Sequence, residues 1–172
     1  MCNALLQALG IMAGSQGTMN NFVWGNDDMQ NYETICGGSG AGLNFNGCSG
    51  VQTHMTNTRS TDPEILEFRF PVRVEEMSIR VGSGGDGKFT GGDGITRRLR
   101  FLKQMTVTTL CSHRRVPPKG LNGGENGEIG REWIERHNGI IDRHNGNDKN
   151  ELYPGDVFVM QTPSGGGFGT KN

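Results

Sequence analysis

Residues 53–59 carry the side chains of this sequence that are best suited to act on a small molecule. The run places His54, Thr56, Asn57 and Arg59 close together along the chain. An imidazole can gain or lose a proton near neutral pH, and a guanidinium can hold a carboxylate through two parallel N–H groups. The run therefore predicts a site that binds a carboxylate and moves a proton.

The same run also fits a plain surface segment. In that interpretation His54 and Thr56 share one side of a strand, and Asn57 caps a turn. Arg59 then pairs in solvent with an acidic side chain of residues 62–64, where an ion pair contributes little to stability. Residue types alone leave both interpretations open.

A second candidate site lies at residues 33–42, where Glu33 leads into a glycine-rich run. Glycine lacks a Cβ atom, so the backbone there can approach a ligand closely. The N–H groups of this run could face a substrate carbonyl as an oxyanion hole, with Glu33 as an acid or a base. Alternatively, Glu33 points outward from an edge strand. The residues predicted to contact a substrate are Thr34, Gly37, Gly38, Ser39, Gly40 and Thr56.

Other motifs lack the context that their chemistry needs. Residues 82–87 match a loose G-x-G-x-x-G pattern, but they lie between predicted strands and precede no helix, so they do not form a dinucleotide-binding loop. His113, His137 and His144 have no spacing suited to a metal cage, and the four cysteines contain no C-x-x-C pair. We therefore predict no metal site and expect reduced thiols.

Composition argues against several functional classes. Seventeen Lys and Arg against eighteen Asp and Glu give a formal net charge of -1, which provides no general attraction to nucleic acids or anionic membranes. The basic residues between 97 and 119 could hold an anionic ligand or an acidic partner, or form a solvated face. The apolar stretch 4–13 is too short for a membrane span and lacks the basic flank of a secretory signal. We expect a cytoplasmic protein.

Hydrophobic periodicity predicts the elements that position the first half of the chain. Apolar residues recur at helical spacing over Ala4–Met12, with Gly14 as a C-cap. Residues 31–36 and 51–55 fit strands on either side of the glycine-rich run. Residues 61–64 form a capping-box pattern around a proline, which predicts the start of a short helix.

The second half has the pattern of an antiparallel β protein. A slip in the alternation at residues 75–76 predicts a β-bulge within one long strand. Residues 95–101 and 105–111 fit two strands of a meander, and Asn138-Gly139 fits a tight hairpin turn. A last strand is predicted at 157–161, before a glycine-rich tail that we expect to become ordered only against another surface.

These elements predict a single domain over residues 1–172, of the α+β class and mainly β. Its antiparallel strands would form a barrel- or sandwich-like meander, with an N-terminal helix and one or two short helices. A chain of this length can bury roughly 70% of its unfolded surface, which is enough for a core. The 29 glycines indicate many turns and close backbone contacts.

The sequence resembles the hydantoinase B/oxoprolinase family along nearly its whole length. The matching runs, in family order, are residues 15–21, 32–42, 53–59, 84–94, 114–120 and 162–169. The resemblance is closest to the 5-oxoprolinase branch, which shares residues 61–64 and 70–73. N-methylhydantoinases and acetone or acetophenone carboxylases are related branches.

The resemblance implies an enzyme that opens a small cyclic amide using ATP. In this family an A portion phosphorylates the amide or carbonyl oxygen and a B portion completes the reaction, so that 5-oxoproline and water give glutamate, ADP and phosphate. This chain resembles only the C-terminal part of a B portion. The resemblance therefore implies that ATP and magnesium are bound by a hydantoinase A-like partner, and that this fragment holds no cofactor.

Functional hypotheses of two classes follow. In the first, the chain is a C-terminal fragment of an ATP-dependent cyclic-amide hydrolase whose catalytic residues are Glu33, His54, Asn57 and Arg59. A subunit of an N-methylhydantoinase or a ketone carboxylase is a variant of this reading. In the second, the chain is a noncatalytic β-rich module that supports assembly with an ATP-hydrolysing partner. The chain could also assemble with copies of itself.

Overall fold

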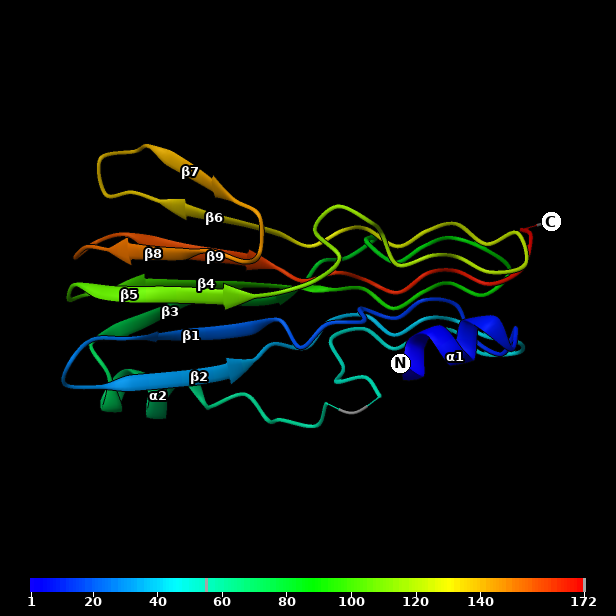
Figure 1. Ribbon diagram of the computed structural model, residues 1–172, viewed down its shortest axis with the longest axis horizontal. Helices are drawn as coiled ribbons and strands as arrows, with labels where there is room; N and C mark the ends of the chain where they lie inside the picture. Colours follow the sequence, from blue (N-terminus) through cyan, green and yellow to red (C-terminus); the bar gives the residue numbers. More distant parts are fainter. Residues whose placement is uncertain (55, 172) are drawn as a thin grey trace.

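The computed structural model describes residues 1–54 and 56–171 and contains two antiparallel β-sheets (Figure 1). The first sheet has the strand order β2 (Gln30–Thr34), β1 (Asn21–Gly25), β5 (Met105–Leu110) and β8 (Lys149–Leu152). The second has the order β3 (Val72–Ile79), β4 (Ile95–Phe101), β9 (Val157–Gln161), β6 (Arg131–Glu135) and β7 (Ile141–His144). The prediction of a mainly β fold is confirmed. Of the two predicted architectures, the structure is a sandwich of two sheets rather than a closed barrel.

Aromatic side chains join the two sheets into one core. Phe22 of β1 stacks on Phe158 of β9, with ring centroids 4.9 Å apart. Trp24 meets Phe101 of β4 edge-on at 5.7 Å and Phe70 at 5.0 Å. Because side chains alternate along a strand, Phe22 and Trp24 share the inner face of β1, and both are buried.

Two local predictions in the five-stranded sheet are confirmed. The pairing of β3 with β4 shifts register between Val74 and Glu76, where the bulge was predicted. A tight turn at Asn138-Gly139 joins β6 to β7. Gly139 has a φ of 86°, and Asn138 Oδ1 accepts a hydrogen bond from the Ile140 N–H at 3.1 Å. Turn chemistry in neighbouring residues was sufficient to predict this hairpin.

Two predicted strand arrangements are wrong. Strands β4 and β5 do not form a meander, because they lie in different sheets and residues 102–104 cross from one sheet to the other. Residues 51–54 form no strand, and Val51 makes only a single bridge to Gly37. The last residue of that predicted strand, Met55, lies outside the described residues. Local alternation could not reveal that long-range packing takes both segments elsewhere.

Both helices of the described residues are short. The N-terminal helix α1 spans Cys2–Ala8 rather than the predicted 4–12, because Gly10, with a φ of 69°, ends it early. Helix α2 spans Pro63–Arg69 and packs against β3. Neither helix in this part of the chain has the length and apolar character that crossing a bilayer requires.

The N-cap of α2 gives a first testable prediction. Asp62 Oδ1 accepts a hydrogen bond from the Glu64 N–H at 2.9 Å, whereas the capping-box pattern predicts Thr61 as the cap. We expect Asp62→Ala to lower the free energy of unfolding in urea by about 1 kcal/mol. Thr61→Ala should change it by less than about 0.5 kcal/mol. A larger loss for Thr61→Ala than for Asp62→Ala would assign the cap to Thr61 instead.

The other half of the molecule is a bundle of extended segments, drawn as loops beside the sandwich in Figure 1. We call this part the glycine bundle, and its segments are residues 12–17, 36–50, 83–94, 117–127 and 162–169. Single backbone hydrogen bonds join the segments. The Gly92 N–H donates to Ser39 O at 2.9 Å, and the Gly165 N–H donates to Gly92 O at 2.7 Å. A Cβ atom added to Gly165 would lie 1.8 Å from Ser39 O, so this spacing requires glycine.

The C-terminal tail belongs to this bundle. Residues 162–168 are buried, and Phe168 is only 5% exposed. Phe168 also forms backbone bridges with Phe89 and Leu121. The surface that orders the tail is therefore the chain itself.

Candidate functional site

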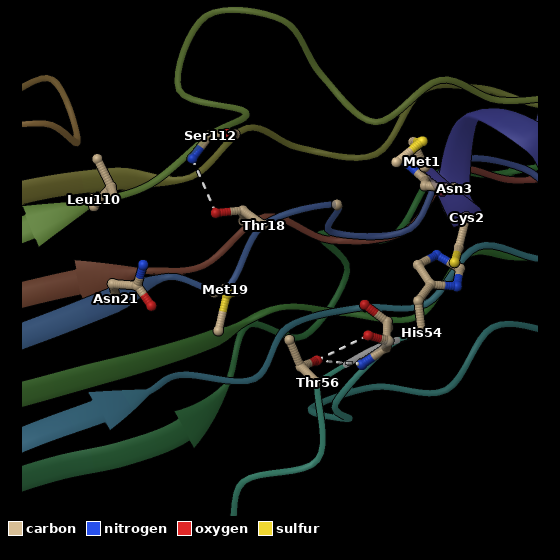
Figure 2. A pocket seen from close by; sticks show the side chains of 12 residues that line it. Met1, Cys2, Asn3, Thr18, Met19, Asn21, His54, Thr56, Leu110 and Ser112 are labelled. Carbon is tan, nitrogen blue, oxygen red and sulfur yellow. Dashed lines mark hydrogen bonds between the residues drawn. The ribbon is translucent and has the colours of Figure 1, made fainter.

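Two runs that are far apart in the sequence meet at an open cavity of ≈ 670 Å³ (Figure 2). One is the loop that leads into β1, and the other is the histidine-containing run after the glycine-rich segment. The lining residues are Met1, Cys2 and Asn3 at α1, Gly17, Thr18, Met19 and Asn21 at the start of β1, Thr53, His54 and Thr56, and Leu110 and Ser112 at the end of β5.

A buried hydrogen-bond network fixes the loop that forms one wall of the cavity. Asn20 is fully buried and has a φ of 44°, a left-handed conformation that asparagine tolerates. Its Nδ2 donates to Gln16 Oε1 at 2.7 Å and to Ile35 O at 3.0 Å. Its Oδ1 accepts from Arg114 Nη1 at 2.9 Å, and Arg114 also pairs with the buried Glu132 of β6. The wall is thereby tied to both sheets.

Thr18 connects this wall to the end of β5. Its Oγ1 accepts hydrogen bonds from the N–H groups of Asn20, at 3.2 Å, and Ser112, at 2.9 Å. Both bonds use lone pairs of the oxygen, so the hydroxyl can still donate to another acceptor. Thr18 is therefore held in place, and its hydroxyl hydrogen can still be donated to a ligand in the cavity.

His54 lies in a tight turn on another wall. Thr56 Oγ1 accepts from the Thr53 N–H at 3.0 Å and donates to Thr53 O at 2.8 Å, and His54 has a φ of 56°. Figure 2 shows the Cys2 side chain directed toward the imidazole. Partial burial lowers the pKa of His54 below its ordinary value, and the positive α-ammonium of Met1 lowers it further. The imidazole is therefore neutral at pH 7 and able to accept a proton.

Glu33 lies inside the sandwich rather than at the cavity. Its carboxylate accepts hydrogen bonds from Arg97 Nη2 at 3.0 and 3.1 Å. Glu33 is 5% exposed and Arg97 is 1% exposed. The alternative of an outward-facing Glu33 is wrong, although β2 is an edge strand. The catalytic role of Glu33 stays a prediction. Its carboxylate is engaged in an ion pair between the two sheets.

Most of the predicted substrate-binding residues lie away from the cavity lining. The N–H groups of residues 37–40 all donate within the chain, over 2.9 to 3.3 Å, so they do not face an open oxyanion hole. Thr34 is buried, and its hydroxyl donates to Tyr32 Oη at 3.1 Å. Thr56 alone of the six lines the cavity. For Thr34, Gly37, Gly38, Ser39 and Gly40, contact with a substrate stays a prediction.

The four predicted catalytic residues are also separated. His54 lines the cavity, whereas Asn57 and Arg59 are exposed and lie outside its lining. The alternative ion pair between Arg59 and residues 62–64 is not formed in the described part of the chain. The structure therefore brings His54 and Thr56 together with the loop before β1, and leaves the other candidates elsewhere.

A family model for hydantoinase B/oxoprolinase matches residues 1–171. The chain belongs to the hydantoinase B/oxoprolinase family. It is 48% identical to a 5-oxoprolinase of Dictyostelium discoideum over 100% of this chain and 14% of that protein. It is 44% identical to 5-oxoprolinase 1 of Arabidopsis thaliana over 98% of this chain and 13% of that protein. The chain thus spans about 14% of the length of the Dictyostelium relative.

Two longer chains with solved structures share this fold. The ATP-dependent caprolactamase from Pseudomonas jessenii superposes with a TM-score of 0.78 and 26% identity, over 97% of this chain and 32% of that chain. A nucleotide-free acetone carboxylase superposes with a TM-score of 0.73 over 96% of this chain and 27% of that chain. At 18% identity, the second likeness shows the fold alone.

The described residues of this hydantoinase B-type chain contain no group of three or more His, Cys, Asp or Glu side chains that could hold a metal ion. The glycine-rich residues 82–87 lead into an extended segment, so no helix N-terminus is available there to bind phosphate. All four cysteines are free, two of them buried and two exposed.

Sequence reasoning missed several polar residues of the cavity in this family member. Thr18 and Asn21 belong to an asparagine-rich run that also fits an ordinary turn, and its density of amides and hydroxyls was the available signal. Asn3 and Ser112 carry no comparable signal. Only the tertiary structure brings α1 and the end of β5 to the same cavity.

Proposed function

We propose that the cavity forms part of the substrate site of an ATP-dependent hydrolase of cyclic amides, with 5-oxoproline as the substrate. The convergence of residues 17–21 and 53–56 on one cavity carries this proposal. The names of the relatives support the substrate class, since two are 5-oxoprolinases and a third is a caprolactamase. The complete reaction would convert 5-oxo-L-proline, ATP and water into L-glutamate, ADP and phosphate.

In this proposal the chain supplies groups that orient the amide and accept a proton. Neutral His54 takes a proton from the water that attacks the amide carbon, and the protonated imidazole returns it to the ring nitrogen as the C–N bond breaks, which is general acid–base catalysis. The hydroxyl of Thr18 donates to the ligand from a neighbouring wall. Arg59 and Asn57 continue the same run outside the lining. A hydantoinase A-like partner would bind ATP and magnesium, which agrees with the ATP dependence in the name of the caprolactamase relative.

Substitution of His54 tests the proposal in the assembled enzyme, made from this chain, the A-like partner and the remaining B segment. Loss of a general base lowers turnover by about 10²–10⁴-fold, so His54→Ala should reduce glutamate release at least about 100-fold without changing the melting temperature. The matched control is His137→Ala, whose side chain is 65% exposed and outside the cavity lining. It should keep turnover within about twofold.

The pH profile should separate a proton-transfer role from a packing role. The pKa of His54 is lowered, so its basic form is present at neutral pH and is lost only as the pH falls through a value below the ordinary one of about 6.5. Glutamate release should therefore decline along an acidic limb below about pH 6.5 that His54→Ala lacks. Turnover within about threefold of wild type for His54→Ala would contradict the proposal.

One observation favours a noncatalytic assembly role as a second candidate. Helix α1 has no buried residue, and Leu5 and Leu9 are 61% and 63% exposed. Such apolar side chains are commonly covered by a partner surface. This candidate predicts unchanged turnover for every variant that still assembles, His54→Ala included.

A further inference from the structure

The side chains around the cavity are nearly free of formal charge. The lining residues that the structure describes include no Lys, Arg, Asp or Glu. The sequence has no Lys or Arg before Arg59, so the walls formed by residues 1–56 come from a stretch without cationic side chains.

Neutral hydrogen-bond donors take the place of charges in this cavity. Asn3 Oδ1 accepts from the Ser15 N–H at 3.0 Å, and Asn21 Oδ1 accepts from Tyr32 Oη at 2.7 Å. Their Nδ2 groups, together with the hydroxyl of Thr18, remain available as donors to a ligand. The neutral imidazole of His54 adds an acceptor. This is the set of groups that the C=O and N–H of a cyclic amide require.

A carboxylate needs a different environment. Removing an ionised carboxylate from water is costly unless a cation or several N–H donors replace the lost hydration. Sites that hold carboxylates tightly accordingly use Arg or Lys, most often through paired hydrogen bonds. Among the side chains described at this cavity, none can supply such a pair.

We propose that this cavity binds the uncharged amide ring of the substrate, and that a cation outside the lining holds the substrate carboxylate. This inference rests on the proposed function and assigns the ring and the carboxylate of the substrate to different parts of the enzyme. Arg59 is the first cation that follows Thr56 along the chain, and a basic residue of another portion of the enzyme is the other source. Ring recognition and carboxylate recognition are then separable, so the cavity itself accepts cyclic amides that carry no carboxylate.

Two pairs of isosteric variants test where the carboxylate lies, in the assembled enzyme. Met19→Glu and Met19→Gln differ by one negative charge, and so do Ser112→Asp and Ser112→Asn. Met19 is 47% exposed and Ser112 is exposed, so all four variants should fold. A carboxylate bound in the cavity would be repelled by the new charge, which would raise KM for 5-oxoproline about tenfold or more at low salt.

We expect the two KM values within each pair to agree within about threefold, because the carboxylate lies outside the cavity. Asn21→Leu, which removes a donor to the ring, should raise KM about three- to tenfold. A tenfold gap within either pair would overturn the inference by placing the carboxylate in the cavity. Unchanged kinetics for both Asn21→Leu and His54→Ala would overturn it by placing the ring elsewhere. Absence of glutamate from the wild-type assembly would reject the proposed function itself.

Discussion

Glu33→Gln should lower the free energy of unfolding by about 3–5 kcal/mol, although it changes one oxygen for one nitrogen. The carboxylate accepts both of its hydrogen bonds from Arg97, and the two side chains are 5% and 1% exposed. Neutralising one partner leaves a buried guanidinium without its counter-charge. In a chain of this size the loss corresponds to a fall in melting temperature of about 6–20 °C. Urea and thermal unfolding measure both quantities.

A solvent-accessible ion pair provides the matched control. Arg98 binds Glu135 through two hydrogen bonds of 2.7 and 2.8 Å, but their side chains are 25% and 32% exposed. Glu135→Gln should cost less than about 1 kcal/mol, because water replaces the lost partner. Equal losses for Glu33→Gln and Glu135→Gln would show that burial does not set the cost.

The double variant Glu33→Leu/Arg97→Met separates a structural role of Glu33 from the catalytic role predicted from the sequence. It removes both charges together, so its stability should lie within about 1 kcal/mol of wild type or above it. We expect the assembled enzyme to keep its turnover in this variant, because Glu33 lies outside the cavity. Loss of turnover in a stable double variant would instead support a catalytic Glu33.

Gly165→Ala should destabilise the protein by about 3 kcal/mol or more. The added Cβ would lie 1.8 Å from Ser39 O and 2.3 Å from Ser39 C. Both contacts are to backbone, so no rotamer change can relieve them, and the neighbouring segment must move. Gly38→Ala should behave alike, since its Cβ would lie 1.9 Å from Gly92 O. The free energy of unfolding in urea measures the loss.

A glycine in open space gives the control for these two changes. Gly82 has a φ of 82° and no atom within 4 Å of an added Cβ. Asparagine tolerates left-handed backbone, so Gly82→Asn should cost less than about 1 kcal/mol. If Gly165→Ala were as mild as Gly82→Asn, the segments of the glycine bundle would be more loosely packed than their spacing indicates.

Features with local causes were predictable from the sequence. The bulge at residues 75–76 is visible as a slip in the alternation of β3. In the Asn138-Gly139 turn, Gly139 supplies the left-handed backbone of the hairpin. The family followed from long ordered runs of matching residues. The alternation within single strands predicted a mainly β fold but left a barrel and a sandwich open.

Features that depend on distant segments were not predictable in the same way. Nothing in residues 95–111 indicates that β4 and β5 belong to opposite sheets. A carboxylate such as Glu33 can act as a catalyst, so its residue type suggested a catalytic role. Only the structure shows that it forms an ion pair with Arg97 of the other sheet. The same is true of the cavity lining. His54 was predicted as a site residue from residues 53–59, whereas the place of Ser112 in the lining follows only from the fold. Burial and pairing are decided by partners that local patterns do not encode.

The glycine bundle also constrains how this chain is made on the ribosome. Gly14 O accepts from the Gly166 N–H at 2.7 Å, and the Gly38 N–H donates to Pro163 O at 3.1 Å, so the hydrogen-bond partners of these early segments are translated 152 and 125 residues later. At about 5–20 residues per second, this delay lasts roughly 6–30 s. During that time the nascent glycine-rich segments have exposed N–H and C=O groups and no partner strand. The four-stranded sheet has all its strands once β8 has emerged, whereas the bundle closes only when residues 162–169 emerge from the exit tunnel.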